Sequence, residues 1–236
     1  MEKYYKVAGL LFKMESYGMT DERAERYRCP PAETVDFEIV SVWPDHKEEC
    51  PHLSDSVGEY LATGSCFYRN LLDFGGMMLH SSAVVVDGKA YLFSADCGTG
   101  KSTHTQLWLK LFGDRAFILN DDKPALRLED GVWYAYGTPW SGKHDISADL
   151  RVPVAGIAML RRGETNEIEP FGGMEAIHSI FKQVNRPKGP EYRVKLLELL
   201  DQLLSTVPVW KLQCNMELEA AKVAYQAMSQ SPPRPL

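Results

Sequence analysis

Short apolar runs, each ending in turn-forming residues, follow one another through the middle of the chain. Residues 77–86 and 90–93 are rich in apolar side chains, as expected of strands buried on both faces. The Asp87-Gly88 pair between them favours a two-residue hairpin turn. The pattern therefore predicts two neighbouring antiparallel strands at this point.

Other strands are predicted where short runs are apolar or alternate with polar residues. They are expected at residues 4–11, 35–42, 116–119, 125–128, 132–136, 152–160, 168–170 and 207–212. Helices are predicted at residues 53–72, 174–184, 192–204 and 217–228, where apolar residues recur with helical spacing. Ser54 is the expected N-cap of the first helix, and Gly64 permits a break within it. Residues 231–236 are expected to be a frayed tail.

The order of these elements divides the chain near residue 52. Residues 1–52 contain strand patterns, a Cys29-Pro30-Pro31 breaker and a charged stretch, so we expect a small β-rich lobe. Residues 53–236 mix strands and helices and are expected to form an α/β domain. A single compact domain is the alternative, because no repeat or low-complexity linker separates the two parts.

Composition and charge are ordinary for a soluble protein. The 236 residues are 44% hydrophobic and 25% charged, and the net charge of −6 gives no electrostatic reason to bind nucleic acid or an anionic membrane. No apolar run approaches the roughly 20 residues of a membrane span, and the first residues lack a signal-peptide pattern. The five cysteines are scattered without a CxxC pair, which favours reduced thiols. We expect a cytoplasmic protein.

A glycine-containing loop follows the strand at residues 90–93 and leads into a helical pattern. Such a loop binds phosphate through inward-facing backbone N–H groups, a lysine and a metal-binding hydroxyl. Lys101 and Ser102 supply the last two groups, and the helix N-terminus favours an anion. Ala95 replaces the first glycine of the usual GxxxxGK[ST] pattern, so a chance glycine turn is the alternative. The candidate nucleotide-binding residues are Cys97, Gly98, Thr99, Gly100, Lys101, Ser102 and Thr103.

Two adjacent carboxylates, Asp121 and Asp122, follow the strand at residues 116–119. One can hold a metal ion together with Ser102 while the other accepts a proton. The sequence does not assign these two roles, because coupled carboxylates can share them. A turn or helix cap is the structural alternative, since aspartate favours such positions.

His80 and Lys143 complete the candidate catalytic group with Lys101, Asp121 and Asp122. His80 lies just before the hairpin that leads to the loop, one strand away from it, although isolated histidines are more often structural. Lys143 follows a stretch rich in glycine and aromatic residues. Loop lysines are usually solvated, but glycines allow a backbone to approach a ligand closely.

Taken in order, these residues resemble the superfamily of HPr kinase and phosphoenolpyruvate carboxykinase. The matching segments are Leu79-His80-Ser81-Ser82-Ala83, Leu92-Phe93, Cys97-Gly98-Thr99-Gly100-Lys101-Ser102-Thr103 and Asn120-Asp121-Asp122. Carboxykinases pair a strand of the type M-H-C-S-A with a loop of the type L-S-G-T-G-K-T-T and a later G-D-D. HPr kinases have a comparable histidine, a G-K-S loop and a D-D pair. The match covers residues 78–122 and leaves the N-terminal lobe and the C-terminal third without a motif.

The resemblance implies an α/β fold with a mixed central β-sheet and a P-loop, beside the small N-terminal lobe. It implies that Lys101 and Ser102 hold phosphate and magnesium, and that the two aspartates divide metal binding and proton acceptance. It makes His80 a metal ligand or the partner of an aspartate, and Lys143 a contact to the transferred phosphate or to an acidic group. The chain is much shorter than a carboxykinase and lacks the HPr kinase segment with a metal-binding glutamate. Compact relatives of HPr kinase, including ones associated with modified-peptide biosynthesis, are the nearer comparison.

We therefore expect a kinase that uses ATP and Mg²⁺ and transfers the γ-phosphoryl group to a hydroxyl of a peptide, a protein or a small molecule. No motif separates ATP from GTP, or Mg²⁺ from Mn²⁺. Two other hypotheses stay open. One is carboxykinase-like phosphorylation of a small organic acid, and the other is a nucleotide-binding switch or scaffold without chemistry. The leucine face at residues 192–204 is expected to be core, whereas an exposed stripe would drive homo-oligomer formation.

Overall fold

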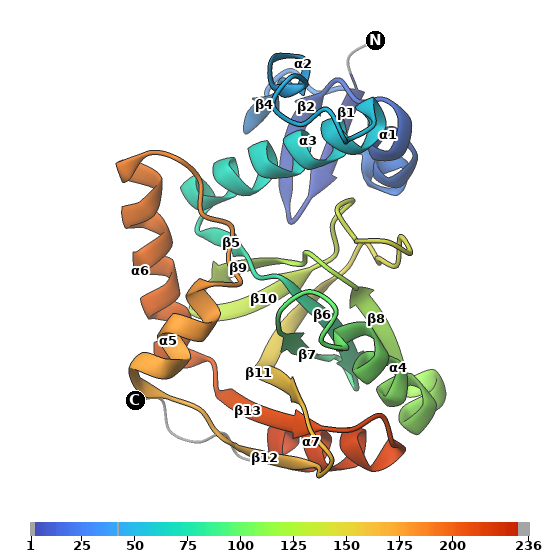
Figure 1. The fold of residues 1–236 in the computed structure, drawn as a ribbon. Helices are drawn as coiled ribbons and strands as arrows, with labels where there is room; N and C mark the ends of the chain where they lie inside the picture. The colour runs from blue at the N-terminus through green and yellow to red at the C-terminus, as the bar shows by residue number, and fades with distance from the viewer. Residues whose placement is uncertain (1–2, 42, 231–236) are drawn as a thin grey trace.

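The computed structural model describes residues 3–41 and 43–230 and shows a mixed α/β protein with a large curled sheet and a small separate one (Figure 1). The small sheet is N-terminal and has the strand order β3-β1-β2-β4. Its strands are β1 (Lys3–Val7), β2 (Leu10–Met14), β3 (Arg28–Cys29) and β4 (Phe37–Ile39). The tail predicted at residues 231–236 lies outside the described residues.

The single strand predicted at residues 4–11 is wrong. The chain reverses at Ala8 and Gly9, whose φ angles of 52° and 77° are both positive, and β1 pairs with β2 as an antiparallel hairpin. An Ala-Gly pair is a weak turn signal, since alanine rarely adopts positive φ. The strand predicted at residues 35–42 is present but shorter.

Helix α3 joins the two sheets and begins as predicted, because the Ser54 side chain accepts a hydrogen bond from the Val57 amide. The helix runs through Gly64 without a break. A Cβ atom at Gly64 would lie 2.7 Å from Cδ1 of Trp140, so the glycine allows close packing of the indole. The helices of this part of the chain are α1 (Gly18–Ala24), η1 (Glu25–Tyr27), α2 (Trp43–His46), α3 (Asp55–Leu71) and η2 (Leu72–Phe74).

The core beneath the small sheet extends past residue 52. Tyr5 and Phe12 of the β1–β2 hairpin are fully buried and share a hydrophobic cluster with Phe67 of α3 and with Trp140. The division of the chain at residue 52 into a lobe and a domain stays a prediction, and α3 packs against elements on both sides of it.

The large sheet is mixed, as predicted, and its described strands run in the order β5-β9-β10-β11-β7-β6-β8, with β13 and β12 continuing from β11. Strand β11 pairs in parallel with both β7 and β13, whereas the other pairs are antiparallel. The strands are β5 (Gly76–Met78), β6 (Ser81–Val86), β7 (Lys89–Ser94), β8 (Ala116–Asn120), β9 (Ala125–Glu129), β10 (Val132–Tyr136), β11 (Arg151–Arg162), β12 (Glu167–Pro170) and β13 (Val209–Cys214).

Both predicted hairpins of this sheet are confirmed, but the continuous strand at residues 77–86 is wrong. Its first part, β5, pairs with β9, and its second part, β6, lies between β7 and β8. The backbone between them is held elsewhere, since Leu79 bridges to Val184 and the His80 amide donates to the Gln183 carbonyl at 2.7 Å. An apolar run does not reveal such a change of partner.

Helices cover both faces of the large sheet (Figure 1). On one face, α4 and α7 share a hydrophobic cluster with β6, β7 and β13. On the other face, Leu196, Leu199, Leu200 and Leu203 of α6 are buried, whereas Val194 and Leu197 remain about half exposed. No helix among residues 3–41 and 43–230 has the length and apolar character needed to cross a bilayer. The helices are α4 (Lys101–Phe112), η3 (Gly113–Arg115), α5 (Gly173–Phe181), α6 (Pro190–Thr206) and α7 (Leu218–Ser229).

Candidate functional site

The loop at residues 95–100 connects β7 to the first turn of α4. Gly98 and Gly100 have φ angles of 76° and 119°, a region that glycine adopts without the strain of a Cβ atom. Nothing lies within 4 Å of a Cβ placed at either glycine, so backbone conformation and not crowding requires them. Gly100 is the N-cap of α4 and no side chain caps the helix, which leaves its first amides available to a ligand.

Lys101 folds back on this loop. Its Nζ atom donates to the Ala95 carbonyl at 2.9 Å, and the side chain is buried. Burial lowers the pKa of Lys101, while the charges of Asp122, Asp96 and Asp121 act in the opposite direction. Burial and the nearby carboxylates therefore act on the Lys101 charge in opposite directions.

The remaining loop residues differ in exposure. Cys97 and Thr103 are exposed, and Thr99, Gly100 and Ser102 are half-buried. The neighbouring strand β11 supports the loop, because the Arg162 guanidinium donates to the carbonyls of Thr99 at 2.9 Å and Gly98 at 2.5 Å. Arg162 is therefore a support for the loop that spacing alone did not predict.

Asp121 points toward the start of α4. Its Oδ1 atom accepts a hydrogen bond of 2.7 Å from Ser82 Oγ, which also lies 2.9 Å from Thr105 Oγ1. Thr105 in turn donates to the Ser102 carbonyl at 3.1 Å. This hydroxyl chain, contributed by β6 and α4, connects the first aspartate to the loop helix.

Asp122 is oriented by the residue that ends β8. The Asn120 side-chain oxygen accepts from the amides of Asp122 at 3.0 Å and Lys123 at 2.8 Å, an Asx turn that bends the chain after the strand. The Asn120 amide is fixed by Thr138, at 3.2 Å from both its carbonyl and its hydroxyl. As a result the two aspartates point in different directions.

A hydrogen-bonded chain links Asp122 to the loop. Nε2 of His80 lies 3.1 Å from Oδ1 of Asp122, and Nδ1 of His80 lies 3.1 Å from Oε1 of Gln183. Nε2 of Gln183 donates to Oδ1 of Asp96 at 2.8 Å. The chain therefore runs from the second aspartate to the phosphate-loop candidate through a histidine and a glutamine.

The donors and acceptors in this chain orient the ring of His80. Gln183 directs its amide nitrogen to the Asp96 carboxylate, so its oxygen faces Nδ1 of His80. The other ring nitrogen faces the Asp122 carboxylate. Both ring nitrogens therefore face oxygen atoms, and these two contacts hold the imidazole ring between Asp122 and Gln183.

Positive charge surrounds Asp122. Lys123 forms an ion pair with its Oδ2 atom and also lies 5.9 Å from the centroid of the Tyr60 ring. Burial would raise the pKa of Asp122, but the hydrogen bond from His80 and the charge of Lys123 outweigh it and lower the pKa to about 2. Asp122 is therefore ionised throughout the physiological pH range.

Lys143 lies at the edge of this group. Its side chain is exposed, and the described residues form no hydrogen bond or ion pair with it. Its neighbour Gly142 contacts the site, since a Cβ atom there would lie 2.7 Å from Cβ of Asp122. The structure thus places the backbone of this loop against Asp122 and leaves the Lys143 side chain exposed to solvent.

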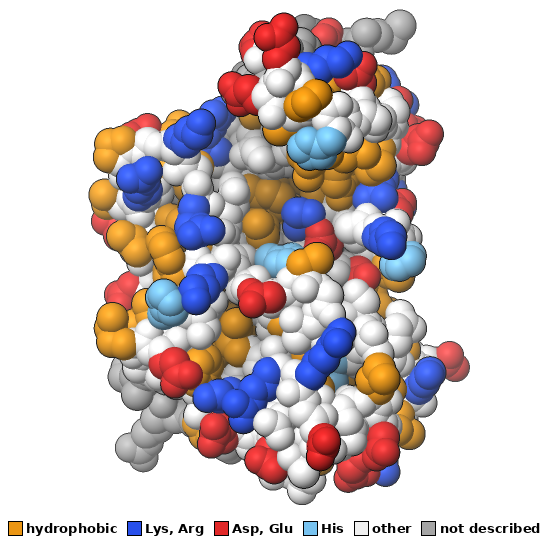
Figure 2. All heavy atoms as spheres, viewed as in Figure 1, with side chains coloured by type: hydrophobic (Ala, Val, Ile, Leu, Met, Phe, Trp, Pro, Cys, Tyr) orange, Lys and Arg blue, Asp and Glu red, His pale blue; other side chains and the backbone are white. Residues whose placement is uncertain are grey.

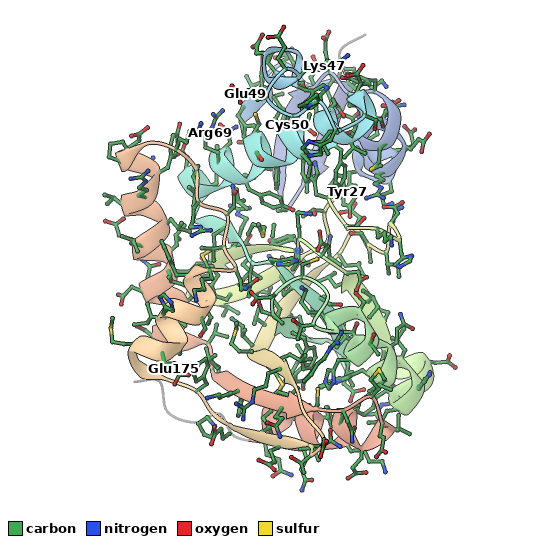
Figure 3. All side chains as sticks on the ribbon, in the orientation of Figure 1. Tyr27, Lys47, Glu49, Cys50, Arg69 and Glu175 are labelled. Atoms are coloured by element: carbon green, nitrogen blue, oxygen red, sulfur yellow. The ribbon has the colours of Figure 1, made fainter. Side chains whose placement is uncertain are left out.

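The N-terminal elements hold the Lys143 loop in place. Arg23 donates to the Gly142 carbonyl at 2.5 Å, and Arg26 pairs with Asp145 at 2.6 Å. Tyr27, labelled in Figure 3, lies 2.7 Å from Ser147 through its hydroxyl. These contacts give the small sheet and its helices a direct connection to the candidate site.

Besides Arg162 and Asp96, sequence reasoning missed Asn120 as an orienting residue, Lys123 and Gln183. Asn120 was noted only as part of a motif, and Lys123 follows the aspartate pair directly, so both were accessible to a sequence argument. Gln183 was not accessible to a sequence argument, because it lies 103 residues after His80 in a stretch without a motif.

The donor set suits a magnesium ion held mainly by a bound phosphate. No group of three or more His, Cys, Asp or Glu side chains that could hold a metal occurs in the described part of the chain. Ser82 occupies Oδ1 of Asp121, and residues 3–41 and 43–230 form no hydrogen bond with its Oδ2. One carboxylate plus a hydroxyl fits the way Mg²⁺ is usually bound together with substrate phosphates.

Comparison with known proteins gives one family. The family model described as "SynChlorMet cassette protein ScmC" matches residues 61–220, which is more than half of the chain. No curated protein matches. Among solved structures, the HPr(Ser) kinase/phosphatase from Coxiella burnetii is distantly similar, with 10% identity, a TM-score of 0.36, and coverage of 63% of this chain and 94% of that chain. The chain belongs to the ScmC family of SynChlorMet cassette proteins.

Proposed function

We propose that this protein is a phosphotransferase that uses ATP and Mg²⁺ to phosphorylate a hydroxyl group. The observation that carries the proposal is the chain from Asp122 through His80 and Gln183 to Asp96. It connects a carboxylate able to accept a proton with the loop expected to hold phosphate. A glycine turn without function would not require such a connection.

Phosphate binding is assigned to the loop and to Lys101. The uncapped amides at the start of α4 and the positive end of the helix dipole favour an anion. Lys101, now bound to the Ala95 carbonyl, would exchange this neutral partner for a phosphate oxygen. The full negative charge of a phosphate oxygen attracts the ammonium group more strongly than the carbonyl dipole does, which favours the exchange.

The aspartates would divide their roles according to their positions. Asp121, linked to α4 through Ser82 and Thr105, would hold the metal together with Ser102. A bound Mg²⁺ would neutralise charge on the phosphates. GTP and Mn²⁺ remain compatible with these residues.

Asp122 would accept the acceptor proton. The acceptor oxygen forms a bond to the γ-phosphorus, the bond from that phosphorus to the bridging oxygen breaks, and ADP leaves with its electron pair. The hydroxyl proton passes to Asp122, and His80 and Lys123 hold this carboxylate ionised and oriented. Both ring nitrogens of His80 are engaged, which supports the aspartate-partner role over the metal-ligand role.

The alternatives receive less support. A carboxykinase-like reaction would need free cations around Lys143, but Arg23 and Arg26 beside that loop already interact with Asp145. A switch without chemistry would not need an ionised carboxylate oriented by His80.

The proposal is tested by measuring ATP affinity with and without Mg²⁺ by calorimetry. Lys101→Met is expected to weaken binding by a factor of ten or more, since a charged hydrogen bond contributes roughly 1.5–3 kcal/mol. Asp121→Asn should remove most of the Mg²⁺ dependence, whereas Asp122→Asn should leave the affinity nearly unchanged. Equal ATP affinity in the wild type and Lys101→Met would contradict the assignment of the loop.

A further inference from the structure

Two adjoining pockets form a groove that begins at His80 and continues along α3. The first pocket has a volume of 450 Å³ and is lined by His80, Lys123, Lys182 and Gln183, among others. The second pocket, also of 450 Å³, is lined by residues of α3 and by the segment 185–188 that follows α5. Asn185 and Arg186 line both pockets, so the two form one continuous surface.

The groove is strongly cationic. Its lining includes Arg69, Lys123, Lys182, Arg186 and Lys188 but no aspartate or glutamate, in a chain whose net charge is −6. Lys123 pairs with Asp122, while none of the other four forms a salt bridge with a described residue. Arg69 and Arg186 lie over the rings of Tyr192 and Phe181, which leaves their charge without a carboxylate partner among the described residues. Cations of this kind, concentrated in a concave surface, attract an anionic ligand.

The second pocket adds an apolar floor. Leu53, Leu61 and Ala62 line it, and Leu61 is 43% exposed. Figure 2 shows this region as a hollow below the N-terminal elements, with hydrophobic side chains at its base and Lys and Arg side chains along its left edge. Cys50 and Arg69, labelled in Figure 3, belong to the same pocket and come from different elements of the N-terminal half.

The groove ends next to the residues that hold Asp122, and this position indicates what the groove binds. Its polar end contains His80 and Lys123, the two residues that hold Asp122. A chain lying in the groove would therefore bring a hydroxyl group close to His80 and Lys123, the two residues that hold Asp122.

We propose that this groove binds the phosphate acceptor, and that the acceptor is an acidic peptide segment with an apolar side chain. The proposal rests on the phosphotransferase function for its chemistry, whereas peptide binding itself can be measured without nucleotide. A compact organic acid would occupy the cationic pocket and leave the apolar one unused. Nucleic acid would match the cations but not the leucine-lined floor.

Fluorescence anisotropy with a labelled peptide tests this binding. The probe is a short fluorescein-labelled peptide of glutamate, leucine and one serine, compared with the same peptide carrying lysine for glutamate. We expect the acidic probe to bind more tightly, and the double variant Arg186→Glu/Lys188→Glu to weaken it about tenfold at low salt. Lys89→Glu, an exposed substitution on β7 away from the groove, should leave the affinity unchanged.

A second variant tests the apolar floor. Leu61→Gln changes a side chain that is already 43% exposed, so the fold should persist, and it is expected to weaken the acidic probe several-fold. Equal affinity for both probes, or no effect of either groove variant, would overturn the proposal. Self-association that Leu61→Gln abolishes, without peptide binding, would assign the groove to a second copy and also overturn it.

ATP binding separates a failure of this inference from a failure of the proposed function. If the protein binds ATP through Lys101 but does not bind the acidic peptide, the proposed function stands and the groove assignment fails. If the protein binds the peptide in the groove but has no affinity for ATP, the proposed function fails and the assignment of the groove as a peptide-binding site stands.

Discussion

Nε2 of His80 lies 3.1 Å from Oδ1 of Asp122, and this pair joins two halves of the candidate site. His80 lies between β5 and β6, whereas Asp122 follows β8. Strand β6 lies between β8 and β7 in the sheet, and β7 leads into the loop. The pair therefore forms close to β7. Its orientation depends on Gln183, which bonds to the second ring nitrogen.

Replacing Gln183 should affect turnover more than nucleotide affinity. Gln183→Leu removes the acceptor for Nδ1 of His80 and the donor to Asp96, so His80 can rotate away from Asp122. We expect kcat to fall about tenfold, as for a displaced orienting group, with the Kd for ATP within about twofold. The control is Gln213→Leu, which removes a hydrogen bond to Thr165 on the opposite part of the sheet. Equal losses in kcat in both variants would refute a positioning role.

Gly142 should tolerate alanine less well than Gly131 does. Both have a φ angle of 79°, so the backbone strain of alanine is similar at the two positions. Only at Gly142 would the new Cβ meet Asp122, at 2.7 Å, while nothing lies within 4 Å at Gly131. Backbone strain should cost Gly131→Ala about 1 kcal/mol of stability, measured by urea unfolding, and Gly142→Ala should lose more because Asp122 must also shift. Only Gly142→Ala should also lose phosphoryl transfer, and similar activity in the two variants would show that this contact does not matter.

Asp122 should stabilise the fold above acidic pH. Its folded-state pKa of about 2 lies below the ordinary value of 3.8, so its contribution is present above pH 4 and is lost as the pH falls toward 2. The unfolding free energy of Asp122→Asn should therefore be lower than that of the wild type at pH 7, by about 2 kcal/mol. The difference should shrink between pH 4 and pH 2. A difference that is independent of pH would place the effect in packing.

Glu59 predicts the opposite pH dependence. Burial raises the pKa of this carboxyl to about 7, despite its hydrogen bond from Thr20. Because the folded form holds the proton more tightly, stability should decrease as the pH rises from about 4.5 through 7. Glu59→Gln should flatten this decrease, giving a higher Tm than the wild type at pH 8 and a similar Tm at pH 4. Parallel Tm curves for the two proteins would contradict the assignment.

Local patterns in the sequence predicted much of this structure. The Asp87-Gly88 turn, the Ser54 cap and the apolar face of α6 each depend on neighbouring residues, and each was confirmed. The β1–β2 hairpin was missed because its turn contains alanine at a positive φ angle, and alanine is not a sequence signal for such a turn. The β5–β6 break was missed because strand partners are chosen by tertiary packing.

The candidate site was likewise predicted only where its residues belong to a local motif. A motif located His80, Lys101, Asp121 and Asp122, whose side chains lie on segments that the sheet brings together. Gln183 and the cations after α5 come from a region without motif character. The bridge from Leu79 to Val184 and the hydrogen bond from the His80 amide to the Gln183 carbonyl bring this region to the site. Their role follows from the fold and not from spacing.

The central claim, transfer of a phosphoryl group with Asp122 as proton acceptor, is tested most directly with γ-labelled ATP. Wild type and Asp122→Asn are incubated with labelled ATP, Mg²⁺ and a pool of acidic serine- and threonine-containing peptides, and the peptides are analysed for label. The account predicts label on a hydroxyl with the wild type and about a hundredfold less with Asp122→Asn, at similar ATP affinity. Equal labelling by the two proteins would contradict the account, as would ATP binding by the wild type without transfer to any peptide or small alcohol.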